Sequence, residues 1–258
     1  MVRLNGLPPW GPFAALQFLT RIPIRLRRAP SMSGLVVWFP VAGAVIGALV
    51  GGASAGLWHV VPPLVAGAVA VAVGLLVTGA FHEDGLGDIA DAFGGGYTLE
   101  RRLEIMKDSR HGTYGVAAMC ASIVVRMIAL GSLPGPATMF AAAVAAHVLA
   151  RTAAVVLMAA APLATHRGLG ADYGQSTTAG RAVTASLLGA AIGALAVGWW
   201  VAPLFAAALV AAGAVGALAM RKIQGISGDV LGAAEQMAEC VVLVVATGLA
   251  AHHTLWWP

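Results

Sequence analysis

Charged residues are what this sequence has least of. Only 10% of its 258 residues are Asp, Glu, Lys or Arg, and 59% are hydrophobic, whereas soluble domains carry about 25% charged residues. This shortage excludes an ordinary water-soluble domain and indicates a membrane protein. The small net charge of +4 suits an anionic membrane surface or an anionic substrate, and we expect no nucleic-acid partner.

Cysteines are also few, and no cleavable signal peptide is evident. Cys120 and Cys240 both lie in apolar runs, where a cysteine usually packs as a small apolar residue, so neither a disulfide nor a cysteine metal site is expected. The N-terminus shows no apolar core followed by a cleavage site, so no cleaved signal peptide is expected. No linker is long enough to separate domains, and residues 1–258 are expected to form a single integral-membrane domain.

Long apolar runs dominate what is present. A helix needs about 20 apolar residues to cross the hydrocarbon core of a bilayer, and it satisfies its own backbone hydrogen bonds there. We therefore predict an all-α fold, a polytopic helix bundle in the lipid bilayer. Its seven predicted transmembrane helices are at residues 36–58, 62–81, 115–133, 137–160, 182–200, 203–220 and 239–257. The spacing of Gly43, Gly47 and Gly51 predicts close contact between two helices.

The connections between these runs alternate in charge. Short uncharged turns lie at 59–63, 134–137 and 200–203. The other connections hold nearly every charge, and they are the arginine run after residue 20 and the segments 82–114, 161–181 and 221–239. Because Lys and Arg favour the cytoplasmic side of a membrane, the charged segments are predicted to face the cytoplasm and to carry the active-site loops.

Acidic residues concentrate in one charged segment, since seven of the 11 fall within 82–114. If 82–93 continues the preceding span as a helix, Asp84, Asp88 and Asp91 share one face. Three carboxylates on one face near lipid must take up protons or a cation, and oxygen ligands suit Mg²⁺. The alternative is a solvated acidic loop that pairs with its own arginines.

The rest of this segment also carries groups that suit phosphate chemistry. A second helix over 98–109 would place Glu104 and Asp108 on one face, so that two helices form a hairpin at the mouth of the bundle. The stretch KDSRHGTYG (107–115) then supplies the cation of Arg110 and the hydroxyls of Ser109 and Thr113, which can bind phosphate oxygens. A helix cap followed by a turn is the alternative for this stretch.

A few polar residues fall inside predicted spans. Arg151 lies near the cytoplasmic end of its span, where it would reach an anionic substrate. Arg126 has no evident partner, and snorkelling towards the interface, or a small error in the predicted position of the span, explains it as well as a function does. His147 is expected to pack between helices.

Carboxylates return near the end of the chain. Asp229, in the glycine-rich stretch 224–239, is expected to be functional, and Asp172 lies on another inner loop. For Glu235 two interpretations stay open, a function and a favourable interaction with the dipole at the start of the last helix.

Five stretches of the chain resemble the cobalamin (5′-phosphate) synthase family, also called adenosylcobinamide-GDP ribazoletransferase. They are FLTRIPI (18–24), FHEDGLGDIADAF (81–93), RRLEIMKDSRHGTYG (101–115), GLG (168–170) and GDVLGAAEQMAE (228–239). The resemblance implies a polytopic, Mg²⁺-requiring enzyme of the bacterial inner membrane. Such an enzyme joins adenosylcobinamide-GDP to α-ribazole or its 5′-phosphate and releases GMP, which closes the nucleotide loop of the cobamide.

The family's patterns can be carried over residue by residue. They fall on His82, Asp84, Gly85, Leu86, Asp88 and Asp91, on Asp108, Ser109, Arg110, Gly112 and Thr113, and on Gly228 and Asp229. This chain departs from the family at two places. Gly87 stands where the family commonly has Ala, and Gln236 stands where it commonly has Glu.

Residues and resemblance together predict one site. Mg²⁺ is held by Asp84, Asp88, Asp91, Glu104 and Asp108 and bridges the diphosphate of adenosylcobinamide-GDP. The catalytic residues are Asp84, Asp88, Asp91, Asp108 and Arg110, and substrate is bound by His82, Lys107, Ser109, Thr113, Arg151 and Asp229. In phosphoryl transfer, positioning and charge neutralisation supply most of the rate enhancement.

Two other functions stay open at this point. One is a membrane phosphotransferase of the CDP-alcohol type, which would act on a lipid alcohol. The other is a cation-coupled transporter, whose acids would more naturally lie at the bilayer midplane. The sequence also leaves the oligomeric state open, a homo-oligomer included.

Overall fold

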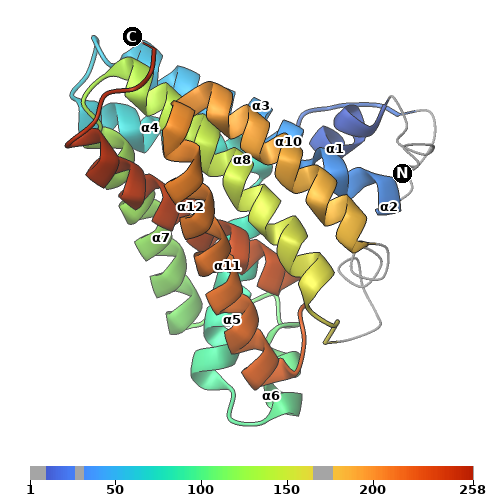
Figure 1. The fold of residues 1–258 in the computed structure, drawn as a ribbon. Coiled ribbons are helices and arrows are strands. Elements are labelled where there is room, and N and C mark those ends of the chain that lie inside the picture. The colour runs from blue at the N-terminus through green and yellow to red at the C-terminus, as the bar shows by residue number, and fades with distance from the viewer. Residues whose placement is uncertain (1–9, 27–31, 165–176, 258) are drawn as a thin grey trace.

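A computed structural model describes residues 10–26, 32–164 and 177–257 as a bundle of α-helices (Figure 1). Within those ranges there is no β-strand, which confirms the all-α prediction. The elements are α1 (Gly11–Leu19), α2 (Met32–Leu35), η1 (Val36–Trp38), α3 (Phe39–Leu57), α4 (Pro63–Thr78), α5 (Phe81–Gly95), α6 (Leu99–Ile105), α7 (Thr113–Gly131), α8 (Pro136–Ala160), α10 (Ala179–Val197), η2 (Gly198–Trp200), α11 (Val201–Ile223) and α12 (Gly228–Ala250).

The helices are long and apolar enough for a multi-pass membrane protein. Five helical stretches in the described residues could cross a bilayer, or six if the bent pair α4 and α5 counts as one span. One of the five, Ala179–Ile223, contains both α10 and α11, and Figure 1 shows α11 running back from the end of α10. The membrane bundle is therefore confirmed, whereas the predicted number of seven spans is not.

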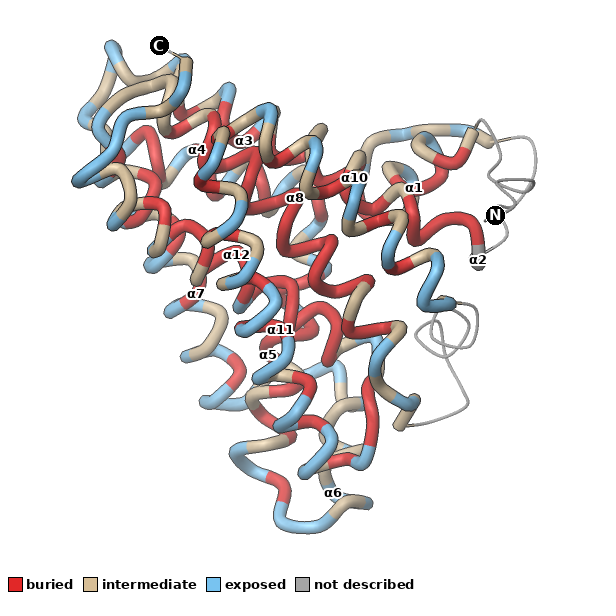
Figure 2. Tube along the Cα trace, in the orientation of Figure 1, coloured by how far each residue is buried: buried red, intermediate tan, exposed pale blue. Residues whose placement is uncertain are grey.

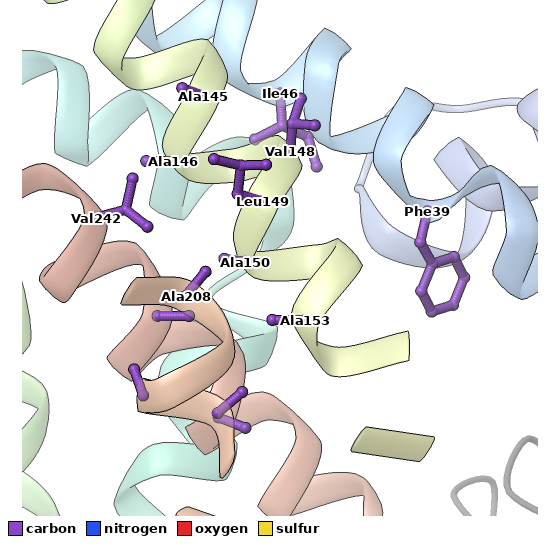
Figure 3. Close-up of a cluster of buried hydrophobic side chains, with 14 of the residues drawn as sticks. Phe39, Ile46, Ala145, Ala146, Val148, Leu149, Ala150, Ala153, Ala208 and Val242 are labelled. Carbon is purple, nitrogen blue, oxygen red and sulfur yellow. The ribbon is translucent and has the colours of Figure 1, made fainter. Parts of the chain in front are cut away.

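Helix α8 forms the centre of the bundle. Nearly all of its residues between Met139 and Met158 are buried, and the tube in Figure 2 is red along most of this helix. Figure 3 shows small side chains of α8, such as Ala146 and Ala150, among apolar side chains of α3, α11 and α12. Small residues let helix backbones approach closely, which is how helices associate in lipid.

The glycine ridge of α3 lies directly against α8. A Cβ atom added to Gly43 would lie 2.5 Å from the carbonyl oxygen of His147, and one added to Gly47 would lie 2.6 Å from the Cα atom of Val144. A Cβ atom added to Gly51 would lie 2.9 Å from the backbone of Phe140 in α8. The close contact predicted from the spacing of these glycines is therefore confirmed.

The chain turns sharply before the acidic helix. Gly79 and Ala80 both have positive φ angles, 69° and 56°, and α5 leaves α4 at an angle of 91°. The expectation that 82–93 continues the preceding span is thus wrong, because two left-handed residues end α4 and direct α5 sideways. Helix α5 instead packs against α7 and α12.

The second predicted helix of the hairpin is shorter than expected. Helix α6 contacts α5 and lies at the lower tip of the bundle in Figure 1, but it ends at Ile105. Asp108 lies beyond it, so the expectation that Glu104 and Asp108 share a helical face is wrong. Helix α12, in turn, begins at Gly228 and not at 239 as predicted.

Candidate active site

The three aspartates of α5 lie along one helix and differ in exposure. The side chain of Asp84 is 66% exposed, that of Asp88 is 15% exposed, and Asp91 is buried. The predicted helix is confirmed, and it ends in a run of glycines at Gly95. The three carboxylates therefore run from an open end of the helix into the bundle.

An imidazole bridges the first two of these aspartates. Nε2 of His111 lies 3.2 Å from Oδ1 of Asp84, and its Nδ1 lies 3.6 Å from Oδ1 of Asp88. No role was predicted for His111, although it stands inside KDSRHGTYG between Arg110 and Thr113, which were both predicted to be site residues. Its position in that motif was the signal that could have identified it.

Asp91 differs from the other two aspartates, because its carboxylate binds the N-terminus of α7. Its two carboxylate oxygens accept hydrogen bonds from the backbone N–H groups of Gly112, at 2.6 Å, and Gly115, at 2.9 Å. A Cβ at either glycine would collide with this carboxylate. A carboxylate at a helix N-terminus satisfies free N–H groups and interacts favourably with the dipole. Asp91 thus joins α5 to α7, with Thr113 as the first residue of α7.

Asp229 joins the same group from the last helix. It lies in the first turn of α12, and a Cβ on Gly85 would lie 2.9 Å from its carbonyl oxygen. The charge of Asp88 interacts with those of Asp84 and Asp229. We call Asp84, Asp88 and Asp229, together with His111, the carboxylate cluster.

Glu104 and Asp108 lie apart from this cluster. Oε2 of Glu104 accepts a hydrogen bond of 2.6 Å from Arg101, and Oδ2 of Asp108 accepts one of 2.7 Å from Arg110. The hydrogen bonds from the guanidinium and backbone of Arg110 lower the pKa of Asp108 to about 2. Both acids line a cavity of about 350 Å³, as do three other predicted site residues, Asp91, Arg110 and Thr113.

Two further predicted residues, Lys107 and Ser109, are exposed on the connection between α6 and α7. They line neither this cavity nor the larger one described below. Asp172 lies outside the described residues.

The larger cavity, of about 600 Å³, opens where α1 meets the break between α4 and α5. Asp84 and His111 contribute to its wall, and Gln17, Thr20 and Arg21 contribute from the N-terminal side. We call this space the Asp84 cavity. Its volume falls in the range of about 300–1,000 Å³ that is usual for ligand sites.

The structure contains a buried ion-pair network between α5, α7, α8 and α12 that was not predicted from the sequence. Its members are Glu83, Arg126, His147, Arg151, Glu235 and Glu239. Arg126 lies 2.7 Å from Oε1 of Glu83 and 3.1 Å from Oε2 of Glu239. All three side chains are at most 5% exposed. Arg126 is therefore neither snorkelling nor without a partner, as the sequence analysis had considered, because it pairs with carboxylates from α5 and α12.

Arg151 belongs to the same network. Its Nη1 lies 2.5 Å from Glu235 and 2.9 Å from Glu239, and Nδ1 of His82 lies 3.5 Å from Glu235. Arg151 and His82, both predicted to bind substrate, are thus buried among carboxylates and away from the Asp84 cavity. They line a small, mostly apolar pocket of about 60 Å³ beside Glu235.

The start of α12 excludes one of the two interpretations of Glu235, the interaction with the helix dipole. The residue lies two turns inside α12, since Ser227 caps this helix and Gly228 begins it. An interaction with the free N–H groups of the first turn is therefore excluded.

One group in this network has the composition of a metal site. Ligand atoms of His147, Glu235 and Glu239 all lie within 4.8 Å of one another, and in the described part of the chain no other three such residues do so. Nη1 of Arg151, however, lies 3.0 Å from Nδ1 of His147 and as close to both carboxylates. The guanidinium already occupies the position that a cation would take, so we interpret this group as an ion-pair centre, of which His147 is a member.

The chain is similar in sequence to known proteins over nearly its whole length. Residues 11–247 match the family described as cobalamin-5-phosphate synthase. A protein of Bradyrhizobium diazoefficiens named adenosylcobinamide-GDP ribazoletransferase is 41% identical over 239 residues, which cover 90% of this chain and 91% of that protein. Proteins of the same name from Ralstonia pickettii and Chlorobaculum tepidum are 38% and 37% identical and cover at least 90% of both chains.

No solved structure matches this chain. The sequence matches nevertheless extend over nearly the whole chain and include α5, the KDSRHGTYG stretch and the start of α12. The chain therefore belongs to the cobalamin-5-phosphate synthase family.

Proposed function

We propose that this protein transfers the adenosylcobinamide phosphate moiety of adenosylcobinamide-GDP to α-ribazole or its 5′-phosphate. GMP is released and adenosylcobalamin, or its 5′-phosphate, is formed. The names of the relatives support this reaction, and one structural observation carries it to this chain. Residues from α5, α12 and the connection before α7 meet as the carboxylate cluster, and Asp84 and His111 of that cluster line a cavity large enough for part of a nucleotide substrate.

The donor atoms of the carboxylate cluster suit Mg²⁺. This ion prefers oxygen ligands and typically binds one or two carboxylates together with substrate phosphates. Asp84 and Asp88 would hold it, with Asp229 next to them, and it would neutralise charge on the diphosphate when bound. Asp91, Glu104 and Asp108, also predicted as ligands, have their oxygens directed to backbone N–H groups or to arginines. We therefore give them positioning roles at the neighbouring cavity.

The chain's own groups can carry out the remaining steps. A ribose hydroxyl of the acceptor attacks the phosphorus nearer the corrinoid, a new P–O bond forms, and the P–O bond to GMP breaks. The hydroxyl proton passes to a basic group that faces the Asp84 cavity, and His111 has that position. General base catalysis of this kind typically contributes about 10²–10⁴-fold to the rate.

We further propose that the end of the bundle with α5 and α6 faces the cytoplasm of the bacterial inner membrane. Arg101, Arg102, Lys107 and Arg110 lie on or next to α6. Lys222, at the end of α11, meets this region through a hydrogen bond of 2.9 Å from Arg102 to its carbonyl oxygen. Such a concentration of Lys and Arg is typical of the cytoplasmic side.

The direct test is to incubate the purified protein with adenosylcobinamide-GDP, α-ribazole and Mg²⁺ and to measure GMP and cobamide. EDTA should stop the reaction and added Mg²⁺ should restore it. Asp88→Asn should leave the protein folded in the membrane but abolish GMP release. Glu100→Gln, which changes an exposed carboxylate of α6 outside both cavities, is the matched control. Near-normal turnover by Asp88→Asn would reject the assigned metal site.

The transporter alternative keeps two features in its favour, the bent pair α4 and α5 and the buried acids of α12. These acids, however, are paired with Arg126 and Arg151, which leaves little negative charge there for a transported cation. Ion flux into vesicles without GMP release would support the transporter. Transfer to a lipid alcohol instead of α-ribazole would support the CDP-alcohol type.

A further inference from the structure

Arg21 stands out because of where its charge lies. Of the described residues that line the Asp84 cavity, it is the one with a permanent positive charge. The two carboxylates in the same wall have other partners, since Asp84 contacts His111 and Glu83 pairs with Arg126. Arg21 thus lines a cavity of ligand size, and the two carboxylates of that cavity are paired with other residues.

The backbone holds Arg21 in this place. Its N–H group donates a hydrogen bond of 2.7 Å to the carbonyl oxygen of Val77, at the end of α4. The hydroxyl of Thr20 donates to the carbonyl oxygen of Leu16 at 2.6 Å, which secures the residue before it. The side chain then lies across Gly79, where any Cβ would collide with it. Arg21 is therefore positioned at the break between α4 and α5, beside the open end of the acidic helix.

The cations predicted from the sequence lie elsewhere. Arg110 is bound by Asp108 and lines the smaller cavity. Arg151 is buried between Glu235 and Glu239, and Lys107 lines neither cavity. An anionic group in the Asp84 cavity would consequently find its side-chain cation in Arg21.

We propose that Arg21 binds a phosphate group of a substrate in the Asp84 cavity. The proposal rests on the proposed function, which brings one phosphate-bearing substrate to this protein, and two when the acceptor is α-ribazole 5′-phosphate. A guanidinium offers paired donors that match phosphate oxygens, and these charge-assisted hydrogen bonds are stronger than neutral ones. The phosphate belongs either to the diphosphate of adenosylcobinamide-GDP or to the 5′-phosphate of the acceptor.

Steady-state kinetics of the purified full-length protein test this assignment. Arg21→Gln removes the charge, Arg21→Met keeps the bulk that covers Gly79, and Arg21→Lys restores the charge without the paired donors. Arg25→Gln, an exposed arginine four residues further along that lines neither cavity, is the matched control. We expect Arg21→Gln and Arg21→Met to raise one KM at least about tenfold, Arg21→Lys to raise it less, and the control to leave it unchanged.

The choice of substrates distinguishes the two sources of phosphate. If Arg21 binds the diphosphate, the KM for adenosylcobinamide-GDP rises with either acceptor, and the equilibrium Kd for GDP rises as well. If it binds the 5′-phosphate, only the KM for α-ribazole 5′-phosphate rises, and that for unphosphorylated α-ribazole does not.

Unchanged KM values in a folded Arg21→Gln or Arg21→Met enzyme would overturn the inference while leaving the proposed function intact. A fall in kcat alone would also overturn it, because this result would indicate a structural or chemical role without phosphate binding. A wild-type protein that releases no GMP would instead reject the proposed function. The two failures are therefore distinguishable in one series of measurements.

Discussion

Replacing Arg126 by methionine is expected to destabilise the protein by about 3–5 kcal/mol, the usual cost of removing one partner from a buried ion pair. Arg126 is 4% exposed and contacts two carboxylates. Glu239 keeps Arg151 and His147 as partners after the change. Glu83 loses its partner, because Oε1 pairs with Arg126 and Oε2 already lacks a hydrogen bond in the described structure. The cost should therefore come mainly from the uncompensated charge of Glu83.

A double-mutant cycle can test this origin of the cost. Glu83→Gln removes the charge that Arg126→Met leaves unpaired, so the double variant should be more stable than the sum of the two single effects predicts, by about 1–3 kcal/mol. The measurement is the free energy of unfolding in mixed micelles, followed by helical circular dichroism. An exposed pair supplies the control. Arg101→Met breaks the contact between Arg101 and Glu104, whose side chains are 59% and 69% exposed, and should cost at most about 1 kcal/mol.

Two outcomes would refute this reasoning. The first is an Arg126→Met protein as stable as wild type within about 0.5 kcal/mol, which would mean that the Glu83 carboxylate is solvated in the native state. The second is a strictly additive cycle, which would mean that Arg126 acts through packing and not through the charge of Glu83.

Two further predictions concern helix packing and the proposed proton acceptor. Gly47→Ala should cost about 1–3 kcal/mol in unfolding free energy, because its Cβ would meet the α8 backbone. Gly52→Ala, whose Cβ would meet nothing within 4 Å, should be neutral or stabilising by up to about 1 kcal/mol, and an equal loss in both would contradict the close contact of α3 and α8. His111→Gln should lower kcat for GMP release about 10²-fold or more while the KM values change little. The exposed His59→Gln is its control, and normal kcat in His111→Gln would remove His111 from the proposed chemistry.

Local spacing was enough to predict the acidic helix and the glycine ridge. Asp84, Asp88 and Asp91 repeat at the helical period, and Gly43, Gly47 and Gly51 leave one side of a helix without side chains. Both features depend only on residues within three turns of one another, so a single sequence contains the information. The membrane bundle follows in the same way from the length of the apolar runs.

Long-range contacts could not be predicted in this way. The partners of Arg126 lie 43 and 113 residues away, and nothing in its local sequence names them. The break before α5 was missed for a different reason. It requires a left-handed backbone at Ala80 as well as at Gly79, and an alanine seldom adopts that conformation without support from the surrounding structure.

The distribution of charge in the described residues favours cation binding at the carboxylate cluster over cation binding in the ion-pair network. Within the bundle, the acids of the ion-pair network, Glu83, Glu235 and Glu239, face two arginines at distances of 3.1 Å or less. Burial in low dielectric makes any unpaired charge costly, so the compensation there is nearly complete. The carboxylate cluster has as many acids, but in the described residues the basic side chain that pairs with Asp84 and Asp88 is the single imidazole of His111. The negative charge of these three carboxylates, which lie together beside a cavity, is therefore not balanced by neighbouring side chains. A divalent cation bound with a phosphate-bearing substrate would balance it.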